Sequence, residues 1–340
     1  MIAKEKSRHD FIDLLRIIAA FLVIVNHTNS EIFLNRGISF TWFLSLGYFF
    51  VSKIAVPIFV MITGYLMIGR IETYIKHVKR IIRMILVLII FSLPYYVDNI
   101  GIESFDIIHY FKTIIGSSVT TAYWYIYFYI GVLIMLPFLQ RFFNALEKKD
   151  ILIFCILSGV FNMLWPILVH YFPSLQLFGS FQVPILGAYI ALLFIGGYFR
   201  KYGVPKINSI WYILIFIMSL SFNIIMTYIE YQKNAGWYLF LDNREYLPIV
   251  LQSICVFAIF SRVQINERIA SVIKMIGGCT FGVYLLSDLF IKKLRFIYEG
   301  VCATGVHELF AVVLFEIIVF AVGFAITFIL KQIPYLKKIV

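Results

Sequence analysis

Long apolar blocks alternate with short polar segments along the whole 340-residue chain. A helix needs about 20 mostly apolar residues to cross the hydrocarbon core of a membrane, and most blocks have this length. The blocks are continuous, whereas transmembrane β-strands would alternate apolar and polar residues. The pattern therefore predicts an all-α, polytopic membrane bundle of about ten transmembrane helices, at residues 11–32, 42–68, 81–98, 122–139, 150–171, 183–199, 209–230, 246–262, 273–291 and 309–331.

The composition supports the same architecture. Hydrophobic residues make up 62% of the chain and charged residues only 14%, whereas soluble domains contain about 25% charged residues. This excludes an ordinary soluble enzyme, a disordered protein and a secreted disulfide scaffold. The four cysteines have no metal-ligand spacing, so no metal site is predicted. Without a repeat or a long linker, residues 1–340 are expected to form one integral-membrane domain.

The net charge of +11 would suggest a nucleic-acid partner in a soluble protein. Here the basic residues fall between the apolar blocks, which is how membrane proteins encode orientation, so no nucleic acid is expected. With the N-terminus inside, 20 of the 29 lysines and arginines lie in cytoplasmic segments and 7 in outer segments. This imbalance predicts that both termini are cytoplasmic. Asp13 and Arg16 interrupt the first block, so we expect it to remain a span rather than a cleaved signal peptide.

The first predicted span contains an arginine and a histidine eleven residues apart, Arg16 and His27. In an α-helix this spacing puts both on one face, about 16 Å apart along the axis. Polar groups at membrane depth are costly and therefore point to function. The alternative is structural: Arg16 extends to the interface and His27 bonds a neighbouring helix. Their shared face, with Asn26 beside His27, favours the functional interpretation.

The second predicted span contains Lys53 near the middle of the membrane, where a lysine must be paired, hydrated or deprotonated. Pro57 follows four residues later and frees a backbone carbonyl, while Thr63 and Gly64 permit close helix contact. Many membrane helices bend in this way, so the proline alone indicates little.

Two carboxylates lie at roughly the predicted depth of His27, Asp288 in the ninth span and Glu316 in the tenth. Either is a candidate to orient the imidazole or to pair with Lys53. A purely structural pair is an equal alternative.

A basic segment connects the second and third predicted spans on the cytoplasmic side. It holds Arg70, Lys76, His77, Lys79, Arg80 and Arg83. Such a cluster attracts a polyanion, for example a nucleotide-bearing cofactor. Membrane orientation and anionic lipid explain a basic loop equally well. Arg80 and Arg83, one helical turn apart, are the pair expected to face inward.

These pieces together resemble the membrane acyltransferase-3 family, and most closely its surface-polysaccharide O-acetyltransferases. The resemblance runs from about residue 10 to residue 331. The segments that carry it are DLLR with a histidine eleven residues after the arginine (Asp13 to His27), KIAVPIFVMITGY (Lys53 to Tyr65), KRIIR (Lys79 to Arg83), YWYIYFYIGVLIMLP (Tyr123 to Pro137, including Trp124) and TFGVYLLS (Thr280 to Ser287).

The resemblance implies acyl transfer from cytoplasmic acyl-CoA, in particular acetyl-CoA, with no metal. Lys79, Arg80, Arg83 and Arg16 would hold the phosphates of the donor. His27 would act as general base on an acceptor hydroxyl or briefly carry the acyl group. Lys53 or Thr63 would stabilise the oxyanion. Supporting roles fall to Asp13, Asn26, Pro57, Gly64, Tyr65, Trp124, Asp288 and Glu316.

Two positions depart from the family pattern. Thr63 stands where serine is usual, which is a mild change. Ser287 stands where many members have a histidine, with Asp288 next to it. Any role taken from that second histidine is therefore in doubt here.

Two other functions remain open from the sequence. A proton-coupled secondary transporter would also use His27, Lys53, Asp288 and Glu316, but the chain shows no repeated halves. A non-catalytic membrane sensor would leave Arg16 and His27 without a purpose.

The resemblance further implies a multi-pass protein of the bacterial inner membrane that meets lipid, acyl-CoA and a glycan or lipid-linked saccharide acceptor. A homodimer is compatible with it. The outer segments at about 99–121 and 231–245 are the longest and are expected to select the acceptor. Their aromatic and acidic residues are compatible with sugar recognition, but anchoring at the membrane interface is the more common reason for such residues.

Overall fold

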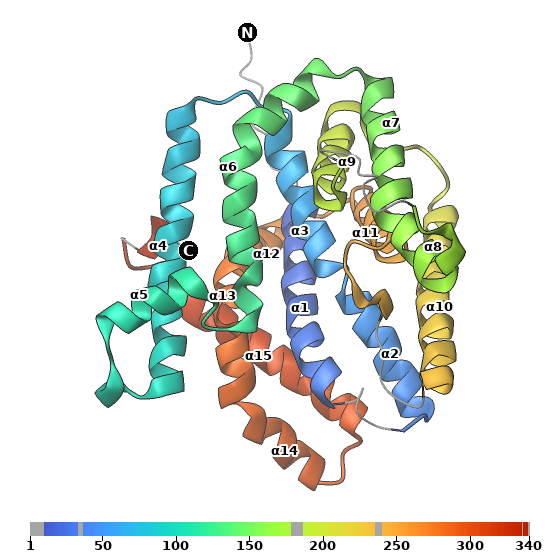
Figure 1. Ribbon diagram of the computed structural model, residues 1–340. Coiled ribbons are helices and arrows are strands. Elements are labelled where there is room, and N and C mark those ends of the chain that lie inside the picture. The colour runs from blue at the N-terminus through green and yellow to red at the C-terminus, as the bar shows by residue number, and fades with distance from the viewer. Residues whose placement is uncertain (1–9, 33–36, 178–185, 235–239, 335, 339–340) are drawn as a thin grey trace. The chain divides into compact units, whose positions relative to one another are not determined.

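The computed structural model describes residues 10–32, 37–177, 186–234, 240–334 and 336–338. It is 83% helical, and the described residues contain no strand. This confirms the predicted all-α membrane bundle (Figure 1). The beginning of the sixth predicted span, residues 183–185, and the basic residues before Asp10 lie outside the described residues.

Two compact units make up the chain, and their segments alternate along the sequence. Unit 1 comprises Met1–Gly69 and Ala145–Gly278, and unit 2 comprises Arg70–Asn144 and Cys279–Val340. No long linker joins them, since consecutive helices pass directly from one unit to the other. The prediction of a single domain stays a prediction.

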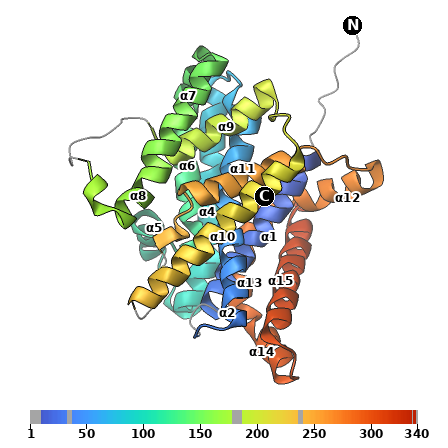
Figure 2. The same ribbon diagram turned by 90° about the vertical axis from the view of Figure 1, so that its right-hand side faces the viewer.

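Unit 1 is built around helices α1 and α3. Its elements are α1 (Asp10–Ile32), α2 (Phe40–Ser52), α3 (Ala55–Thr63), the π-helical turn η1 (Gly64–Ile68), α7 (Lys148–Ser158), the π-helical turn η4 (Gly159–Leu164), α8 (Trp165–Tyr171), η5 (Pro173–Leu175), α9 (Ala188–Tyr202), α10 (Ser209–Asn234), η6 (Phe240–Asp242), α11 (Leu247–Phe260) and α12 (Glu267–Gly277). Helix α1 packs against α2, α3, α11 and α12, and α9 packs against α3 and η1. Helices α10 and α11 lie side by side (Figure 2).

Unit 2 is built around the long helices α4, α6 and α15. Its elements are α4 (Tyr74–Ile100), η2 (Ile102–Ser104), α5 (Ile107–Gly116), η3 (Thr121–Tyr123), α6 (Trp124–Ala145), α13 (Thr280–Lys293), α14 (Arg295–Ala303), α15 (Glu308–Leu330) and η7 (Leu336–Lys338). Helix α13 packs against α4, α14 and α15. Helix α4 ends at Gly101, whose φ of 81° is a left-handed conformation that favours glycine.

Seven helical stretches among the described residues are long and apolar enough to cross a membrane. They are Asp10–Thr28, Phe40–Ile68, Tyr74–Ile100, Thr121–Ala145, Lys148–Tyr171, Ser209–Lys233 and Glu308–Leu330. Helices α12 and α13 give an eighth if they are counted as one bent span. The sixth and eighth predicted spans fall on α9 and α11, which have only 15 and 14 residues. The count of ten and the side of the termini therefore stay predictions.

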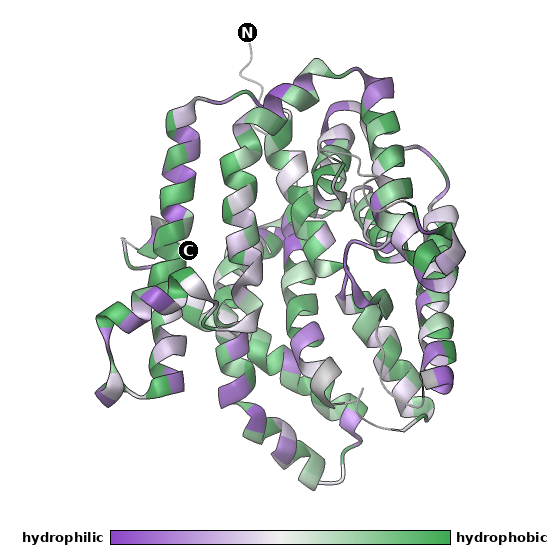
Figure 3. Ribbon diagram, viewed as in Figure 1, coloured by the Kyte–Doolittle hydropathy of each residue, from purple (hydrophilic) through white to green (hydrophobic). Residues whose placement is uncertain are grey.

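The helices differ from the predicted spans at two places. The third helix begins at Tyr74 rather than at residue 81, so the basic cluster from Lys76 to Arg83 is helical. Figure 3 shows these hydrophilic residues along the first turns of α4, followed by a mostly apolar stretch. The ninth span is not one straight helix, because α12 ends at Gly277 and α13 begins at Thr280. Adjacent glycines at 277 and 278 weaken a helix at this point.

Candidate active site

Helix α1 carries the arginine and the histidine of the first predicted span. It runs without a break from Asp10 to Ile32, so Arg16 and His27 share a face about 16 Å apart along its axis. Nη1 of Arg16 donates to Oδ1 of Asp13 over 2.9 Å. Arg16 and His27 are both partly buried, whereas Asp13 is almost fully buried. The structure therefore anchors Arg16 through a buried carboxylate one turn earlier in the same helix.

Asp13 is held in place by the close approach of helix α12. A Cβ atom added to Gly277 would lie only 2.7 Å from Cβ of Asp13. Real side chains do not approach this closely, so glycine is needed at position 277. The end of α12 thus packs directly over the carboxylate that holds Arg16.

Asn26, next to His27, links helix α1 to helix α2. Oγ of Ser52 lies 3.4 Å from Oδ1 of Asn26, and Ser52 also donates to the carbonyl of Phe49 over 2.6 Å. Ser52 is the last residue of α2, so this contact fixes the end of α2 beside the segment of α1 that bears His27.

The second predicted span is interrupted at Lys53. Helix α2 ends at Ser52, a turn covers Lys53 and Ile54, and α3 begins at Ala55. Pro57 has no N–H to donate to the carbonyl four residues earlier, which is that of Lys53. The regular ladder resumes with the bond from Ile58 N to the Ile54 carbonyl at 3.0 Å. Pro57, which by itself was weak evidence for a bend, therefore follows a real break in the helix.

Lys53 lies at this break with its side chain only 6% exposed. Its Nζ is 3.6 Å from Oδ2 of Asp242 and 4.0 Å from the centroid of the Phe49 ring. Neither Asp288 nor Glu316 is the recorded partner, although the sequence suggested both. Asp242 lies in the predicted outer segment 231–245. The turn formed by Phe240–Asp242 packs against α10 within unit 1. An ammonium has three donors, so this one ion pair leaves capacity for a further acceptor.

Thr63 and Gly64 end helix α3 and serve different purposes. Oγ1 of Thr63 donates to the carbonyl of Phe59 over 2.9 Å. A hydroxyl has one proton, so Thr63 would have to break this bond before it stabilised an oxyanion. Gly64 begins the π-helical turn, and a Cβ there would lie 2.0 Å from the carbonyl oxygen of Leu193 in α9. Of the two oxyanion candidates, the geometry favours Lys53.

Tyr65 joins a cluster of aromatic rings around an arginine. Its hydroxyl accepts from Nη1 of Arg200 over 3.4 Å, and the guanidinium carbon lies 5.3 Å from the Tyr65 ring. Phe11 and Phe257 contact the same ring at centroid distances of 5.5 and 5.8 Å. Tyr65 therefore packs the start of α1 against α9 and α11.

A second histidine in unit 1, which the sequence analysis missed, pairs with a buried carboxylate. Nε2 of His170 lies 2.8 Å from Oε1 of Glu230. The His170 ring stacks on Phe240 with centroids 3.6 Å apart and planes 8° from parallel. Sixty residues separate the two partners, so no local motif announces the pair. It holds α8, α10 and the segment before Asp242 together.

Helix α10 also carries a buried polar stripe that the sequence could have revealed. Asn223, Thr227 and Glu230 recur at intervals of four and three residues, which is one helix face. Asn223 and Gln252 of α11 are fully buried. Neither of these two amide side chains, nor Oγ1 of Thr227, has a hydrogen-bond partner among the described residues. A buried polar group without a partner is costly, so the α10–α11 interface is a point of weakness in unit 1.

Three of the four residues predicted to bind the donor, Lys79, Arg80 and Arg83, lie with Lys76 on one face of α4 in unit 2. Lys76, Lys79, Arg80 and Arg83 are spaced as i, i+3, i+4 and i+7. All except Arg80 are exposed. Arg80 instead donates through both of its Nη atoms to the carboxylate of Glu72. This hydrogen bonding lowers the pKa of Glu72 below its ordinary value.

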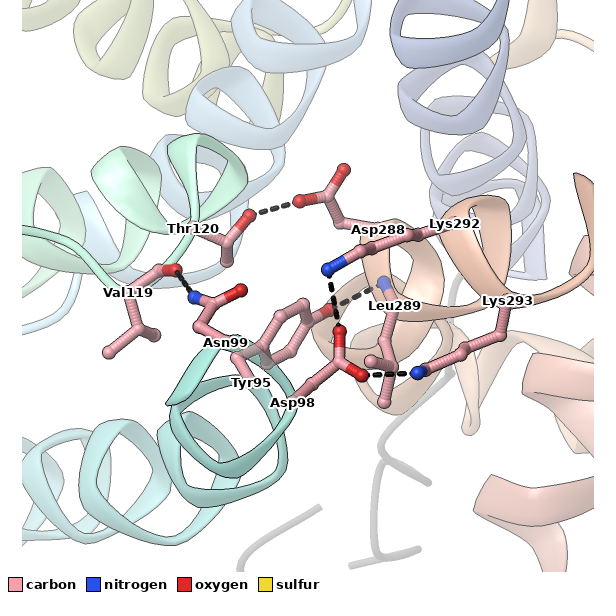
Figure 4. Close-up of polar contacts among 9 residues, drawn as sticks. All are labelled: Tyr95, Asp98, Asn99, Val119, Thr120, Asp288, Leu289, Lys292 and Lys293. Carbon is pink, nitrogen blue, oxygen red and sulfur yellow. Dashed lines mark hydrogen bonds and ion pairs between the residues drawn. The ribbon is translucent and has the colours of Figure 1, made fainter. Parts of the chain in front are cut away.

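Asp288 belongs to a polar network at the other end of α4 (Figure 4). It accepts a hydrogen bond from Oγ1 of Thr120, and the hydroxyl of Tyr95 accepts from the backbone of Leu289 over 3.1 Å. Asp98 binds Lys292 at 2.7 Å and also binds Lys293. The network ties α4 and the segment before α6 to α13, which is a structural role.

The remaining predicted residues of unit 2 lie on three different helices. Glu316 is buried on α15, and Trp124 begins α6 with its ring 5.9 Å from that of Tyr125. Oγ of Ser287, at the position of the family histidine, donates to the carbonyl of Tyr284 over 2.9 Å. Among the residues described, no group of three or more His, Cys, Asp or Glu side chains is placed to hold a metal ion.

Comparison with known proteins gives one result that covers nearly the whole chain. Residues 9–332 match the sequence profile of a family described as an acyltransferase domain. The match spans both units and contains every candidate residue described above. No curated protein and no solved structure matches the chain.

Proposed function

Because this chain belongs to the acyltransferase-3 family, we propose that it moves an acyl group from cytoplasmic acyl-CoA to a hydroxyl group of an extracytoplasmic acceptor. That the chain is a multi-pass membrane acyltransferase follows from the family and from its apolar helices. The proposal adds the donor, the acceptor and the residues that act. The family match over residues 9–332 is the single observation that carries it. Nothing in the fold or the match favours a transporter.

Two separate groups of residues divide the work. The basic face of α4, with Lys79, Arg80 and Arg83, holds the phosphates of CoA. Guanidinium groups bind phosphate through two parallel hydrogen bonds, which suits this task. Acetyl is the acyl group we expect, and a glycan or lipid-linked saccharide of the bacterial cell envelope is the acceptor.

His27 performs the proton transfer. Its imidazole accepts the proton of the acceptor hydroxyl. The acceptor oxygen then attacks the thioester carbonyl, and the carbon–sulfur bond breaks. The departing CoA thiolate takes the proton from the imidazolium, so the enzyme is unchanged after one turnover. Asn26 and Ser52 support the helix segment that presents the ring.

Lys53 stabilises the negative oxygen that forms on the carbonyl carbon. Its ammonium is shielded from water at a helix break, and an electrostatic contact is stronger in such surroundings. The ion pair with Asp242 gives the ammonium a counter-charge when no substrate is present. Thr63 is the weaker candidate because its proton is already donated to Phe59.

Replacement of His27 tests this proposal directly. We expect His27→Ala to lower acyl transfer by about 10²–10⁴-fold, the usual contribution of a general base. The measurements are release of CoA from acetyl-CoA in the presence of envelope glycans, and mass spectrometry of the acetylated glycans from cells that express each variant. CoA binding to the purified variant should be unchanged.

His307→Asn is the matched control, because His307 is exposed and caps helix α15 by accepting from Leu309 N, which asparagine also does. It should retain full transfer. Normal turnover by a folded His27→Ala variant would refute the assignment of the base. No acceptor-dependent cleavage of acyl-CoA by the unmodified protein would refute the acyltransferase proposal as stated.

A further inference from the structure

Glu72 lies just before α4, and its carboxylate pairs with Arg80 on the basic face of that helix. Thr73 precedes the helix as its N-cap, and Glu72 comes just before it. The chain folds so that the Glu72 carboxylate reaches Arg80, two turns into the helix. Lys76 lies between them in the sequence and is exposed to solvent.

The contact between Glu72 and Arg80 occupies one whole edge of the guanidinium. Nη2 of Arg80 donates to Oε1 of Glu72 over 3.0 Å, and Nη1 donates to Oε2. The side chain of Glu72 is only 11% exposed and that of Arg80 is 32% exposed. The pKa of Glu72 is lowered by these bonds, so the carboxylate is charged at neutral pH. This is a formed ion pair and not a passing surface contact.

A carboxylate and a phosphate bind a guanidinium in the same way, through two parallel hydrogen bonds. One edge of the guanidinium holds one such group. An incoming phosphate therefore either displaces Glu72 from the Nη edge of Arg80 or is limited to the donors that remain. Lys76, Lys79 and Arg83 are exposed on the same helix face and supply the positive charge that attracts the anion first.

We propose that Glu72 is a built-in competitor of the acyl donor, and that its carboxylate must leave Arg80 before a phosphate group of CoA binds there. This inference rests on the proposed function, which places the CoA phosphates on this face of α4. Glu72 then sets how tightly the donor binds, and it returns to Arg80 when CoA leaves. The partly buried guanidinium is thus paired both before and after the exchange, and a buried charge without a partner would be costly.

The competing explanation is that Glu72 orients Arg80 for the phosphate. The two roles predict opposite signs for one substitution. Glu72→Gln keeps the size of the side chain and removes its charge. If Glu72 competes, the Kd for CoA falls about threefold to tenfold, as expected from the loss of a partly exposed ion pair and of one nearby anion. If Glu72 orients Arg80, the Kd rises.

The experiment titrates CoA into the purified full-length protein in lipid nanodiscs. Thermal stability of each variant is measured alongside, so that a misfolded sample is recognised. Glu267→Gln is the charge-matched control, because Glu267 is an exposed acid in the first turn of α12 that forms no ion pair with any residue the structure describes. It should change the Kd by less than about twofold.

A double-mutant cycle with Arg80→Ala isolates the contact. In the Arg80→Ala background, Glu72→Gln should change the Kd by less than about twofold, because the competition no longer exists. If Glu72→Gln lowers the Kd for CoA by the same factor in that background, the competitor role is overturned. The effect then comes from the loss of a negative charge near the site.

The outcomes also separate this inference from the proposed function. If Arg80→Ala leaves CoA binding unchanged, the CoA site on α4 is wrong. If Arg80→Ala weakens binding while Glu72→Gln leaves it unchanged or weakens it, the site stands and the competitor role fails. Tighter binding by Glu72→Gln, lost in the double variant, supports both.

Discussion

Lys53 in unit 1 and Asp98 in unit 2 both bring a charge into a bundle of apolar helices, and their surroundings differ. Lys53 lies at a helix break, is 6% exposed and has one recorded ion pair, at 3.6 Å. Asp98 lies on the continuous helix α4, with two lysines as partners. The side chains of those lysines are 61% and 56% exposed, so water readily hydrates them when the ion pairs break.

The difference separates a candidate reactive group from a structural one. A shielded ammonium with one long contact still has N–H donors for a substrate. Its electrostatic energy also changes strongly when a charge forms on that substrate. A charge with two short contacts at the surface is already satisfied. The ion pair of Lys53 therefore suits chemistry, and the ion pairs of Asp98 hold α4 and α13 together.

The largest effect is expected where unit 1 holds its broken span against α9. A Cβ atom at Gly196 would lie 2.1 Å from the carbonyl oxygen of Met61, a backbone atom that cannot move aside alone. We expect Gly196→Ala to cost about 3 kcal/mol or more and to abolish a monodisperse peak in size-exclusion chromatography. Gly131→Ala in α6 meets nothing within 4 Å and should be tolerated. A stable Gly196→Ala protein would show that the break is not rigidly held.

A smaller and asymmetric effect is expected at the ion pair of Lys53. Asp242→Asn leaves the shielded ammonium without its counter-charge, and should lower stability by about 1–3 kcal/mol. Lys53→Met leaves a carboxylate that is 44% exposed and can be hydrated, so it should cost less than about 1 kcal/mol. Lys53→Met should nevertheless reduce acyl transfer about a hundredfold.

Thermal unfolding in nanodiscs and the acetyl-CoA assay measure the two sides of this prediction. Equal losses of stability in Asp242→Asn and Lys53→Met would show that the shielding of Lys53 and the exposure of Asp242 make no energetic difference. Unchanged transfer by Lys53→Met would leave the oxyanion without its proposed donor.

The smallest effect is expected at Asp98. Asp98→Asn removes the charge that binds Lys292 and Lys293, but both lysines are exposed and become hydrated. The expected cost is below about 1 kcal/mol in thermal unfolding, and acyl transfer should not change. Glu299→Gln, which removes the partner of Arg295 on the exposed surface of α14, is a control of similar charge. A transfer defect in Asp98→Asn would give the Asp98 ion pairs a chemical role and contradict the comparison.

Local patterns predicted the helices well wherever one long apolar block forms one helix. The face shared by Arg16 and His27 followed from an eleven-residue spacing, because α1 is unbroken. The same reasoning did not find the break between α12 and α13, since hydropathy averages over a short interruption. The start of α4 was placed seven residues late because charged residues lower hydropathy without ending a helix.

The partners of the charged residues were the least predictable part. Depth along the spans suggested Asp288 or Glu316 for Lys53, yet Asp242 from a connecting segment reaches it. Glu72 was overlooked as the partner of Arg80, and His170 as the partner of Glu230. Such pairs depend on where segments distant in the sequence meet, and spacing carries no information about that.

The sequence alone determined that this chain is a helical membrane protein and pointed to its family, since apolar length and motif spacing are properties of neighbouring residues. The tertiary structure alone decided which charges are paired, which helix is broken at Lys53, and which polar groups of α10 and α11 are buried without partners. The physical reason is that the energy of a charge or an amide in a membrane depends on the atoms packed around it, and folding brings those atoms from remote parts of the chain.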